Sequence, residues 1–203
     1  MIETGGELFG GGAAAGHFME FGRHVHFPQK VLVVIAGAAV AADSDRDAGL
    51  QKGRYGSDAR GQLTVWQRLD YLVDEGTFSP LHILYNPTDN VEGTNNVIDG
   101  LGKISGKWAV IIGFDNKVFA GAWLPGQYEN ILRVTDLSKR LNLPLVWLVN
   151  CSGVKLTEQE KFYAGRRGSG TTFFRHAELN QLGVPILAGI WGTNPAGGGY
   201  QAI

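Results

Sequence analysis

The chain has 203 residues, of which 44% are hydrophobic and 18% charged, and its formal net charge is -1 at pH 7. This balance suits one compact domain and excludes a strong electrostatic attraction to nucleic acid or anionic membranes. Cys151 is the only cysteine in the sequence, which excludes an internal disulfide and a cysteine-rich zinc site.

Residues 1–58 differ in composition from residues 59–203. They are rich in Gly and Ala and show no sustained helical or strand period. We expect a disordered or out-of-frame extension that does not pack on the rest of the chain. Its apolar run over 31–42 is shorter than the about 20 residues that span a bilayer. Because Arg23 and Lys30 precede this run, a secretory signal peptide is an alternative that stays open.

Clear periods begin after this region. The stretch GQLTVWQRLDYLVDEGTF predicts a helix with one apolar face, stopped by Gly76. Residues 82–96 are full of turn formers and predict an irregular segment. Two strands are predicted over 108–114 and 118–123, joined by a turn at 115–117.

The second half of the chain alternates helices with buried strands. Its predicted elements are a helix over 127–141, a strand over 145–149, a short helix from Leu156, a helix over 173–182 and a strand over 186–191. Thr157 and Glu160 have the spacing of a capping box for the short helix. Repeated strand–strand–helix units favour a layered α/β spiral over a doubly wound sheet.

Two glycine-containing loops follow predicted strands, NCSGVK at 150–155 and GTNPAGGGY at 192–200. Backbone N–H groups at such junctions lack strand or helix partners, so they can bind developing negative charge. Glycine lets the backbone approach a ligand closely. The alternative, that these glycines only make tight turns, stays open on the residues alone.

Other chemistries lack the residues they need. A cysteine hydrolase would pair Cys151 with His176, but nothing in the sequence places them together, and a small buried thiol is the alternative. LGKISGKW lacks the third glycine of a dinucleotide fingerprint, and the five histidines lack metal-ligand spacing, so no metal is expected. Arg166 and Arg167 fit either coenzyme A phosphates or a solvated loop.

The strings NCSGVK, AELNQLG and GTNPAGGGY resemble the biotin-dependent acyl-CoA carboxyltransferases. Over about residues 61–203 the chain is most similar to the carboxyltransferase (alpha) subunits of glutaconyl-CoA decarboxylases. The resemblance implies a crotonase-like α/β fold of strand–strand–helix units, with two such domains in tandem. It further implies that the N-terminal domain holds the acyl-CoA, the C-terminal domain holds biotin, and active sites form between subunits.

The implied reaction moves the carboxyl group of glutaconyl-CoA to biotin on a carrier subunit and leaves crotonyl-CoA. By motif, the implied oxyanion hole uses the backbone N–H groups of Val154 and of Gly197 or Gly198, with Gly153 and Ala196 beside the substrate. The implied partners are the acyl-CoA, the biotin carrier, a membrane decarboxylase subunit and further copies of the chain. The implied location is the cytoplasm, peripheral to the inner membrane through those partners.

Two features depart from this family. Residues 1–58 do not resemble the charged helical start of its members, and the sequence stops after the second loop. We therefore expect residues 59–203 to be part of an N-terminal carboxyltransferase domain that shows no turnover in isolation. Two alternatives stay open: a carboxyltransferase (beta) subunit acting on propionyl-, methylcrotonyl- or acetyl-CoA, and an inactive fragment that binds only acyl-CoA or a partner subunit.

Overall fold

A mixed β-sheet forms the centre of the computed structural model, which describes residues 31–35, 62–85, 96–163 and 168–202. Its strands are β1 (Val31–Ile35), β2 (Ser79–Leu81), β3 (Val97–Ile104), β4 (Lys107–Phe114), β5 (Leu145–Val149) and β6 (Ile186–Ile190). Their order across the sheet is β1-β6-β5-β4-β3-β2. β4, β5, β6 and β1 run parallel, whereas β2, β3 and β4 pair antiparallel.

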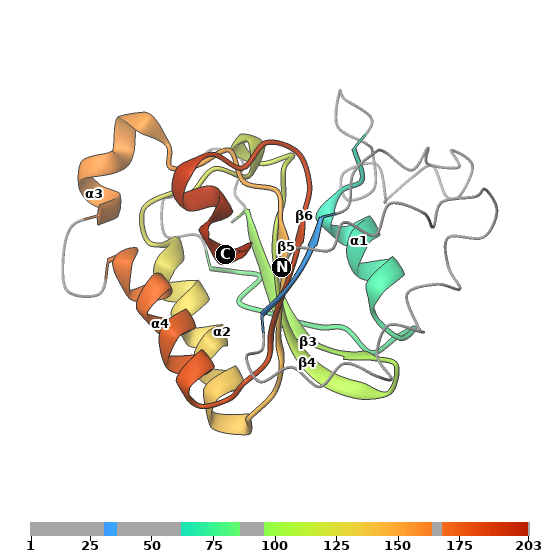
Figure 1. Ribbon diagram of the computed structural model, residues 1–203. Helices are drawn as coiled ribbons and strands as arrows, with labels where there is room; N and C mark the ends of the chain where they lie inside the picture. The colour runs from blue at the N-terminus through green and yellow to red at the C-terminus, as the bar shows by residue number, and fades with distance from the viewer. Residues whose placement is uncertain (1–30, 36–61, 86–95, 164–167, 203) are drawn as a thin grey trace, which may run out of the picture.

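Helices cover both faces of this sheet (Figure 1). They are α1 (Val65–Leu72), α2 (Gln127–Leu141), α3 (Gln159–Tyr163) and α4 (Gly170–Gln181). α1 lies on one face, and α2 and α4 lie side by side on the other. Short 3₁₀ segments are η2 (Phe119–Gly121), η3 (Leu156–Glu158) and η4 (Ala196–Ala202). The sequence β3-β4-α2 is a strand–strand–helix unit, as expected for a spiral fold.

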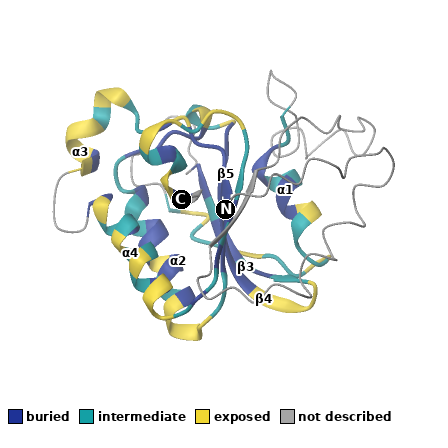
Figure 2. Ribbon diagram, viewed as in Figure 1, coloured by how far each residue is buried: buried dark blue, intermediate teal, exposed yellow. Residues whose placement is uncertain are grey.

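The core has two parts, one on each face of the sheet (Figure 2). On the α2 face, the Phe114 ring stacks between the rings of Trp123 and Trp147, at centroid distances of 5.9 and 6.1 Å. On the α1 face, Val65 and Leu69 are buried against the sheet. The ends of β5 and β6 are therefore held from both sides, which gives the loops that follow them a rigid base.

Several predicted elements are confirmed. α2 spans 127–141 and β5 spans 145–149, as predicted, and β6 ends one residue before its predicted end at 191. α4 begins at Gly170, three residues earlier than predicted. These elements have strong apolar periods, which burial against the sheet reinforces.

The predicted strand over 118–123 is wrong. The segment forms η2 instead, and only Trp123 pairs, with the loop after β5. All three residues of η2 have positive φ, from 47° to 70°. Gly121 also approaches the backbone oxygen of Asn150 so closely that a Cβ would not fit. The tight packing of these two segments breaks the strand that β-propensity favours.

β3 was not predicted, because its own residues weaken the strand signal. Gly100 and Gly102 lie within it, and a Cβ on Gly100 would stand 2.9 Å from the Phe78 ring. Glycine is unfavourable in strands except where another group approaches closely. The two glycines thus make room for Phe78 on the α1 face.

One strand lies within the Gly- and Ala-rich region 1–58, and one capping prediction is wrong. Residues 31–35 form β1 and pair with β6 in parallel. η3 begins at Leu156 as predicted, but its cap is Lys155, which makes no side-chain cap bond. The capping box expected from Thr157 and Glu160 therefore does not form, because Thr157 lies inside the helical turn. The division of the chain at residue 58 otherwise stays a prediction.

Candidate functional site

The loops after β5 and β6 lie against each other, and one side-chain amide connects them. Asn194, in the second loop, accepts a hydrogen bond on Oδ1 from the Cys151 N–H at 2.6 Å. Its Nδ2 donates to the carbonyl oxygens of Trp191 at 2.8 Å and Gly192 at 3.3 Å. Asn194 thus bonds to both loops at once, and it fixes where the second loop turns beside the first.

Glycine is required where these loops touch. A Cβ on Gly198 would lie 2.9 Å from the Cys151 carbonyl oxygen and 3.3 Å from the Gly153 nitrogen. Gly153 has φ +90°, and a Cβ there would stand 3.4 Å from the Pro195 ring. Ala196 also adopts positive φ, at 45°, at the start of η4. The glycines therefore do more than make turns, because they let two backbones approach each other.

The N–H group of Val154 points away from its neighbouring segment. Trp123 donates its N–H to the Gly153 oxygen at 2.8 Å, and the Lys155 N–H donates to the Trp123 oxygen at 3.0 Å. Because N–H groups alternate in direction along extended chain, the Val154 N–H faces the opposite side. Within the described part of the chain it has no acceptor.

The second loop distinguishes its two candidate amides. The Gly198 N–H donates to the Pro195 oxygen at 2.9 Å, so it is already engaged. The Gly197 N–H, by contrast, has no acceptor among residues 31–35, 62–85, 96–163 and 168–202. Orphan N–H groups of this kind bind anionic oxygen well. The structure therefore favours Gly197 over Gly198 as the partner of Val154 in a candidate oxyanion hole.

Cys151 and His176 do not form a nucleophile and base. Burial raises the pKa of the Cys151 thiol to about 12, and its sulfur packs against Gly153, with the Gly153 nitrogen at 3.4 Å. Burial lowers the pKa of His176 to about 4, and its ring packs on Trp147 at a centroid distance of 5.3 Å. Cys151 is thus a buried thiol that helps to seat the loop, the alternative left open by the sequence.

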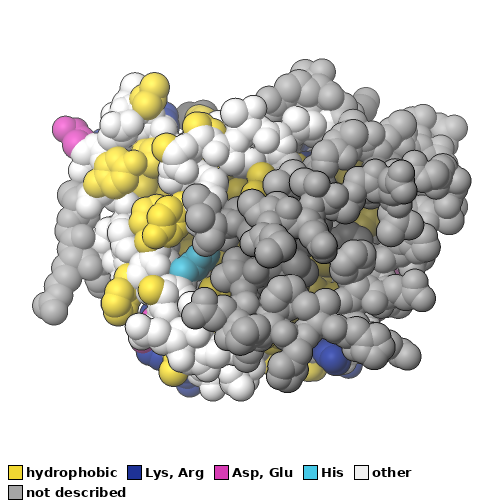
Figure 3. Space-filling view, viewed as in Figure 1, with side chains coloured by type: hydrophobic (Ala, Val, Ile, Leu, Met, Phe, Trp, Pro, Cys, Tyr) yellow, Lys and Arg dark blue, Asp and Glu magenta, His cyan; other side chains and the backbone are white. Residues whose placement is uncertain are grey.

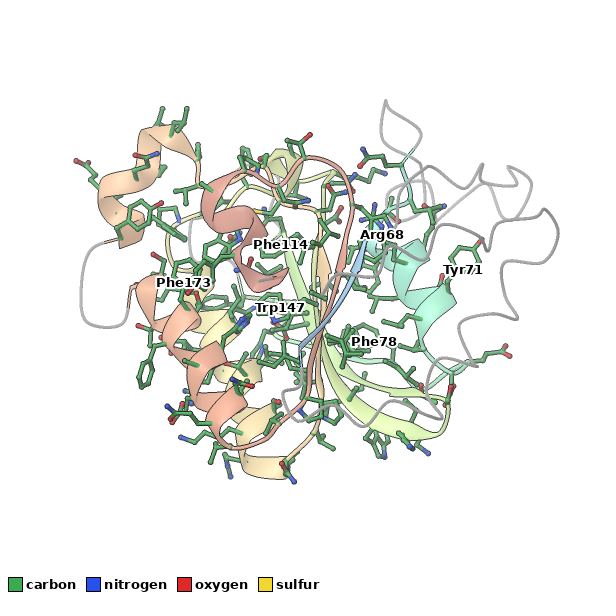
Figure 4. All side chains as sticks on the ribbon, viewed as in Figure 1. Arg68, Tyr71, Phe78, Phe114, Trp147 and Phe173 are labelled. Atoms are coloured by element: carbon green, nitrogen blue, oxygen red, sulfur yellow. The ribbon has the colours of Figure 1, made fainter. Side chains whose placement is uncertain are left out.

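The apolar wall next to the second loop comes from α4. The Phe173 ring lies 4.2 Å from the Tyr200 ring and 5.9 Å from the Trp123 ring, between centroids. Phe173 points from α4 toward the core in Figure 4. In Figure 3, hydrophobic side chains gather on the part of this view that α3 and α4 occupy in Figure 1. The predicted coenzyme A residues Arg166 and Arg167 lie outside the described residues.

Sequence comparison assigns the chain to a family. Residues 57–203 match the carboxyl transferase domain family. The chain belongs to this family. It is 56% identical over 144 residues to the glutaconyl-CoA decarboxylase subunit alpha of Acidaminococcus fermentans, a match that covers 71% of this chain and 24% of that protein.

Solved carboxyltransferase structures share the fold. The beta subunit of P. aeruginosa geranyl-CoA carboxylase matches with a TM-score of 0.63 and 26% identity, over 70% of this chain and 27% of that chain. Transcarboxylase 12S, crystallised as a hexamer, matches with a TM-score of 0.62 and 22% identity, over 71% of this chain and 28% of that one. The crotonase-like α/β fold is confirmed. This chain spans about a quarter of the length of each of these three proteins.

Membrane-spanning helices and clusters of metal ligands are both absent from the described residues. No helix among them is long and apolar enough to cross a membrane. No three of their His, Cys, Asp and Glu side chains come together in a way that could hold a metal ion. The sequence pattern revealed neither the hydrogen bonds by which Asn194 links the two loops nor the buried position of Arg68 on α1. An Asn-Pro pair is a turn signal that pointed to the position of Asn194, but not to its bonds with the first loop.

Proposed function

We propose that this carboxyl transferase domain binds the thioester oxygen of glutaconyl-CoA between the N–H groups of Val154 and Gly197. The terminal carboxyl group of that substrate then passes to biotin on a carrier protein. The observation that carries the proposal is a pair of amides that have no acceptor among the described residues, on two loops that Asn194 holds together. The 56% identity to a glutaconyl-CoA decarboxylase subunit supports this substrate over other acyl-CoA thioesters.

The two amides suit the charge that this reaction develops. When the bond to the terminal carboxylate breaks, its electron pair spreads through the conjugated chain onto the thioester oxygen and forms a dienolate. Two fixed N–H donors stabilise that oxygen, and one such donor contributes about 3–4 kcal/mol to the transition state. Protonation of the terminal carbon then gives crotonyl-CoA. Bound biotin would supply the ureido nitrogen that accepts the carboxyl carbon, and the proton released from that nitrogen would balance the proton gained by the terminal carbon.

The buried thiol and the buried imidazole take no part in this proposal. A thiol with a pKa of about 12 stays protonated at neutral pH and is a poor nucleophile. No covalent enzyme intermediate is needed, because the carboxyl group moves directly between substrate and acceptor. The chain's own contribution is to orient the thioester and to stabilise the dienolate oxygen.

The partners follow from the same resemblance. We assign the described residues only to the acyl-CoA half of the site, and biotin to a second domain. Gly153 and Ala196 flank the thioester in this assignment, and Arg166 and Arg167 contact coenzyme A phosphates. A biotin carrier, a membrane decarboxylase subunit and further copies of the chain complete the enzyme, at the cytoplasmic side of the inner membrane.

The test uses crotonyl-CoA labelled with carbon-13 at its thioester carbonyl. Isotope-edited infrared difference spectra of the labelled and unlabelled ligand isolate the stretch of that carbonyl. Two amide donors polarise the C=O bond, so we expect a lower frequency for crotonyl-CoA bound to this chain than for free crotonyl-CoA. Calorimetry gives the concentration at which crotonyl-CoA saturates the chain. An unshifted carbonyl frequency of the bound ligand at that concentration contradicts the oxyanion hole.

Substrate class is tested separately, in the enzyme assembled with its biotin carrier. Carboxyl transfer from glutaconyl-CoA is compared with carboxylation of propionyl-, 3-methylcrotonyl- and acetyl-CoA by carboxybiotin. Faster reaction of glutaconyl-CoA supports the proposal. Preference for one of the other thioesters supports the beta-subunit alternative.

A further inference from the structure

Arg68 lies behind the two loops, on the opposite face of the sheet from α2 and α4. It belongs to α1, and only 5% of its surface is exposed. Figure 4 shows Arg68 between α1 and the sheet, near the end where the loops begin. Arginine is rarely buried this far, because removing a guanidinium from water is costly unless polar groups replace the water.

The guanidinium group contacts the first residue of one loop, Asn150, and the residue directly before the other, Trp191. The two terminal nitrogens of Arg68 lie 3.2 Å from the amide oxygen of Asn150, with the Asn150 amide in the orientation that satisfies both of its polar atoms. The guanidinium carbon stands 4.6 Å from the centroid of the Trp191 ring. Asn150 in turn donates its NH₂ to the Trp191 carbonyl oxygen at 3.2 Å. Arg68, Asn150 and Trp191 form what we call the rear clamp.

The other two members of the rear clamp have restricted positions of their own. The Trp191 N–H donates to the Val149 oxygen at 2.9 Å, in line with the end of β5. The Trp191 ring covers Gly189 so closely that a Cβ on Gly189 would lie 2.8 Å from a ring carbon and would displace the indole. The Asn150 oxygen also lies 3.2 Å from the amide nitrogen of Asn116. Both partners of Arg68 are therefore held on backbone that cannot shift easily.

The rear clamp is close in sequence to the two amides of the candidate oxyanion hole, but Arg68 approaches from the α1 face of the sheet. Asn150 and Val154 belong to the same loop, and Trp191 directly precedes the loop that carries Gly197. We propose that Arg68 is a positioning residue, which sets the distance between the Val154 and Gly197 amides by fixing Asn150 and Trp191 from behind. This inference rests on the proposed function, because it gives the clamp a role in the same oxyanion hole.

A purely structural role would not need a cation here. Replacing buried charges by apolar groups of similar volume is often neutral or stabilising for a fold. Asp115 gives the charge some compensation, since Arg68 is among the groups that oppose the rise in the pKa of Asp115 caused by burial. The guanidinium contributes a fixed geometry, because its planar group places two nitrogens on one amide oxygen and stacks on an indole ring at the same time.

The experiment compares Arg68→Met and Arg68→Lys with Arg133→Met as the matched control. Arg133 on α2 also lies over an aromatic ring, that of Tyr85 at 5.3 Å, but it is half exposed and lies on the opposite face of the sheet from Arg68. Methionine keeps the length of the arginine stem and removes both donors. Lysine keeps the charge beside Asp115 but lacks the fork. The probe is carbonyl-labelled crotonyl-CoA, with its affinity measured by calorimetry and its carbonyl stretch by isotope-edited infrared spectroscopy.

We expect the carbonyl frequency in Arg68→Met to move at least half of the way back toward the free ligand, while the dissociation constant changes by less than about threefold. Arg68→Lys should give an intermediate frequency, and Arg133→Met should match the unaltered chain. In the assembled enzyme, Arg68→Met should lower kcat by about 10- to 100-fold with little change in KM, since small misplacement of a donor has effects of this size.

The outcomes separate the two proposals. A missing frequency shift in the unaltered chain defeats the proposed function itself. A normal frequency shift in the unaltered chain, together with an equal shift in an Arg68→Met variant that thermal unfolding shows to be folded, overturns the rear clamp alone. If Arg68→Met does not fold, Arg68→Lys and Trp191→Phe decide the question, and unaltered frequencies in both overturn the clamp.

Discussion

Substitution by alanine should reduce stability and activity at Gly198 but have little effect at the adjacent Gly197. Gly198→Ala puts a Cβ 2.9 Å from the Cys151 carbonyl oxygen, whereas Gly197→Ala puts one 3.5 Å from the tip of the Phe173 ring. Gly197 is also outside the left-handed region of φ, so alanine fits its backbone. Both changes keep the N–H group and add the same methyl group.

The size of the Gly198→Ala effect follows from the overlap. Relief to an ordinary contact of 3.4 Å requires the loops to separate by about 0.5 Å, the difference between 3.4 and 2.9 Å, and the obstacle is backbone rather than a flexible side chain. Overpacking of this kind costs about 1–3 kcal/mol of folding stability. A displacement of about half an ångström between the two amides should lower kcat by about tenfold, because a 1 Å error costs about 100-fold. For Gly197→Ala we expect a change within about 0.5 kcal/mol and nearly normal kcat.

Urea unfolding of the chain measures the first quantity, and carboxyl transfer from glutaconyl-CoA by the assembled enzyme measures the second. The carbonyl stretch of bound crotonyl-CoA reports loop separation without turnover. Equal behaviour of the two alanine variants in all three measurements would refute the close contact between the loops. A stable Gly198→Ala variant with a normal carbonyl shift would show that loop separation does not control the hole.

Two further predictions concern the buried titratable groups. Cys151→Ala should retain most carboxyl transfer activity, since the thiol packs but does not react, and the small cavity should cost about 1 kcal/mol of folding stability. Loss of all activity in a folded variant would support the thiol as a nucleophile. Burial lowers the pKa of His176 to about 4. Below about pH 6.5 the imidazole is therefore protonated in the unfolded chain but stays neutral in the folded chain until the pH approaches 4. Stability should therefore fall by about 1–3 kcal/mol between pH 6.5 and pH 4 through this group, and His176→Gln should remove that part of the fall in urea titrations. An unchanged pH profile in His176→Gln would show that the imidazole titrates normally in the folded chain.

The sequence predicted the elements that have strong periods and are buried on one or both faces. α2 has apolar residues at three- and four-residue spacings, and β5 and β6 are short apolar runs, so their limits were correct to within a residue. It failed where distant segments decide the local conformation. The positive φ of η2 comes from packing on the Asn150 carbonyl, and the glycines of β3 serve Phe78, neither of which a local pattern reveals.

The candidate site divides in the same way. Glycines and orphan amides at strand ends pointed to the two loops, whereas the choice of Val154 and of Gly197 or Gly198 within them was implied by the family resemblance. The preference for Gly197 needed the bond from the Gly198 N–H to Pro195, which depends on the shape of the turn. Arg68 was out of reach, since it belongs to a helix far away in sequence and acts through Asn150 and Trp191.

Deletion of the Val154 N–H is the most direct test of the central claim, that backbone amides stabilise the dienolate oxygen. Val154→Pro removes the N–H, and Val154→Ala keeps it while shortening the side chain. Carboxyl transfer from glutaconyl-CoA by the assembled enzyme should fall by about 10²–10³-fold in the proline variant and by at most about threefold in the alanine variant. Thermal unfolding and crotonyl-CoA affinity show whether each variant is folded and binds. A folded proline variant that binds crotonyl-CoA and keeps normal turnover would contradict the account.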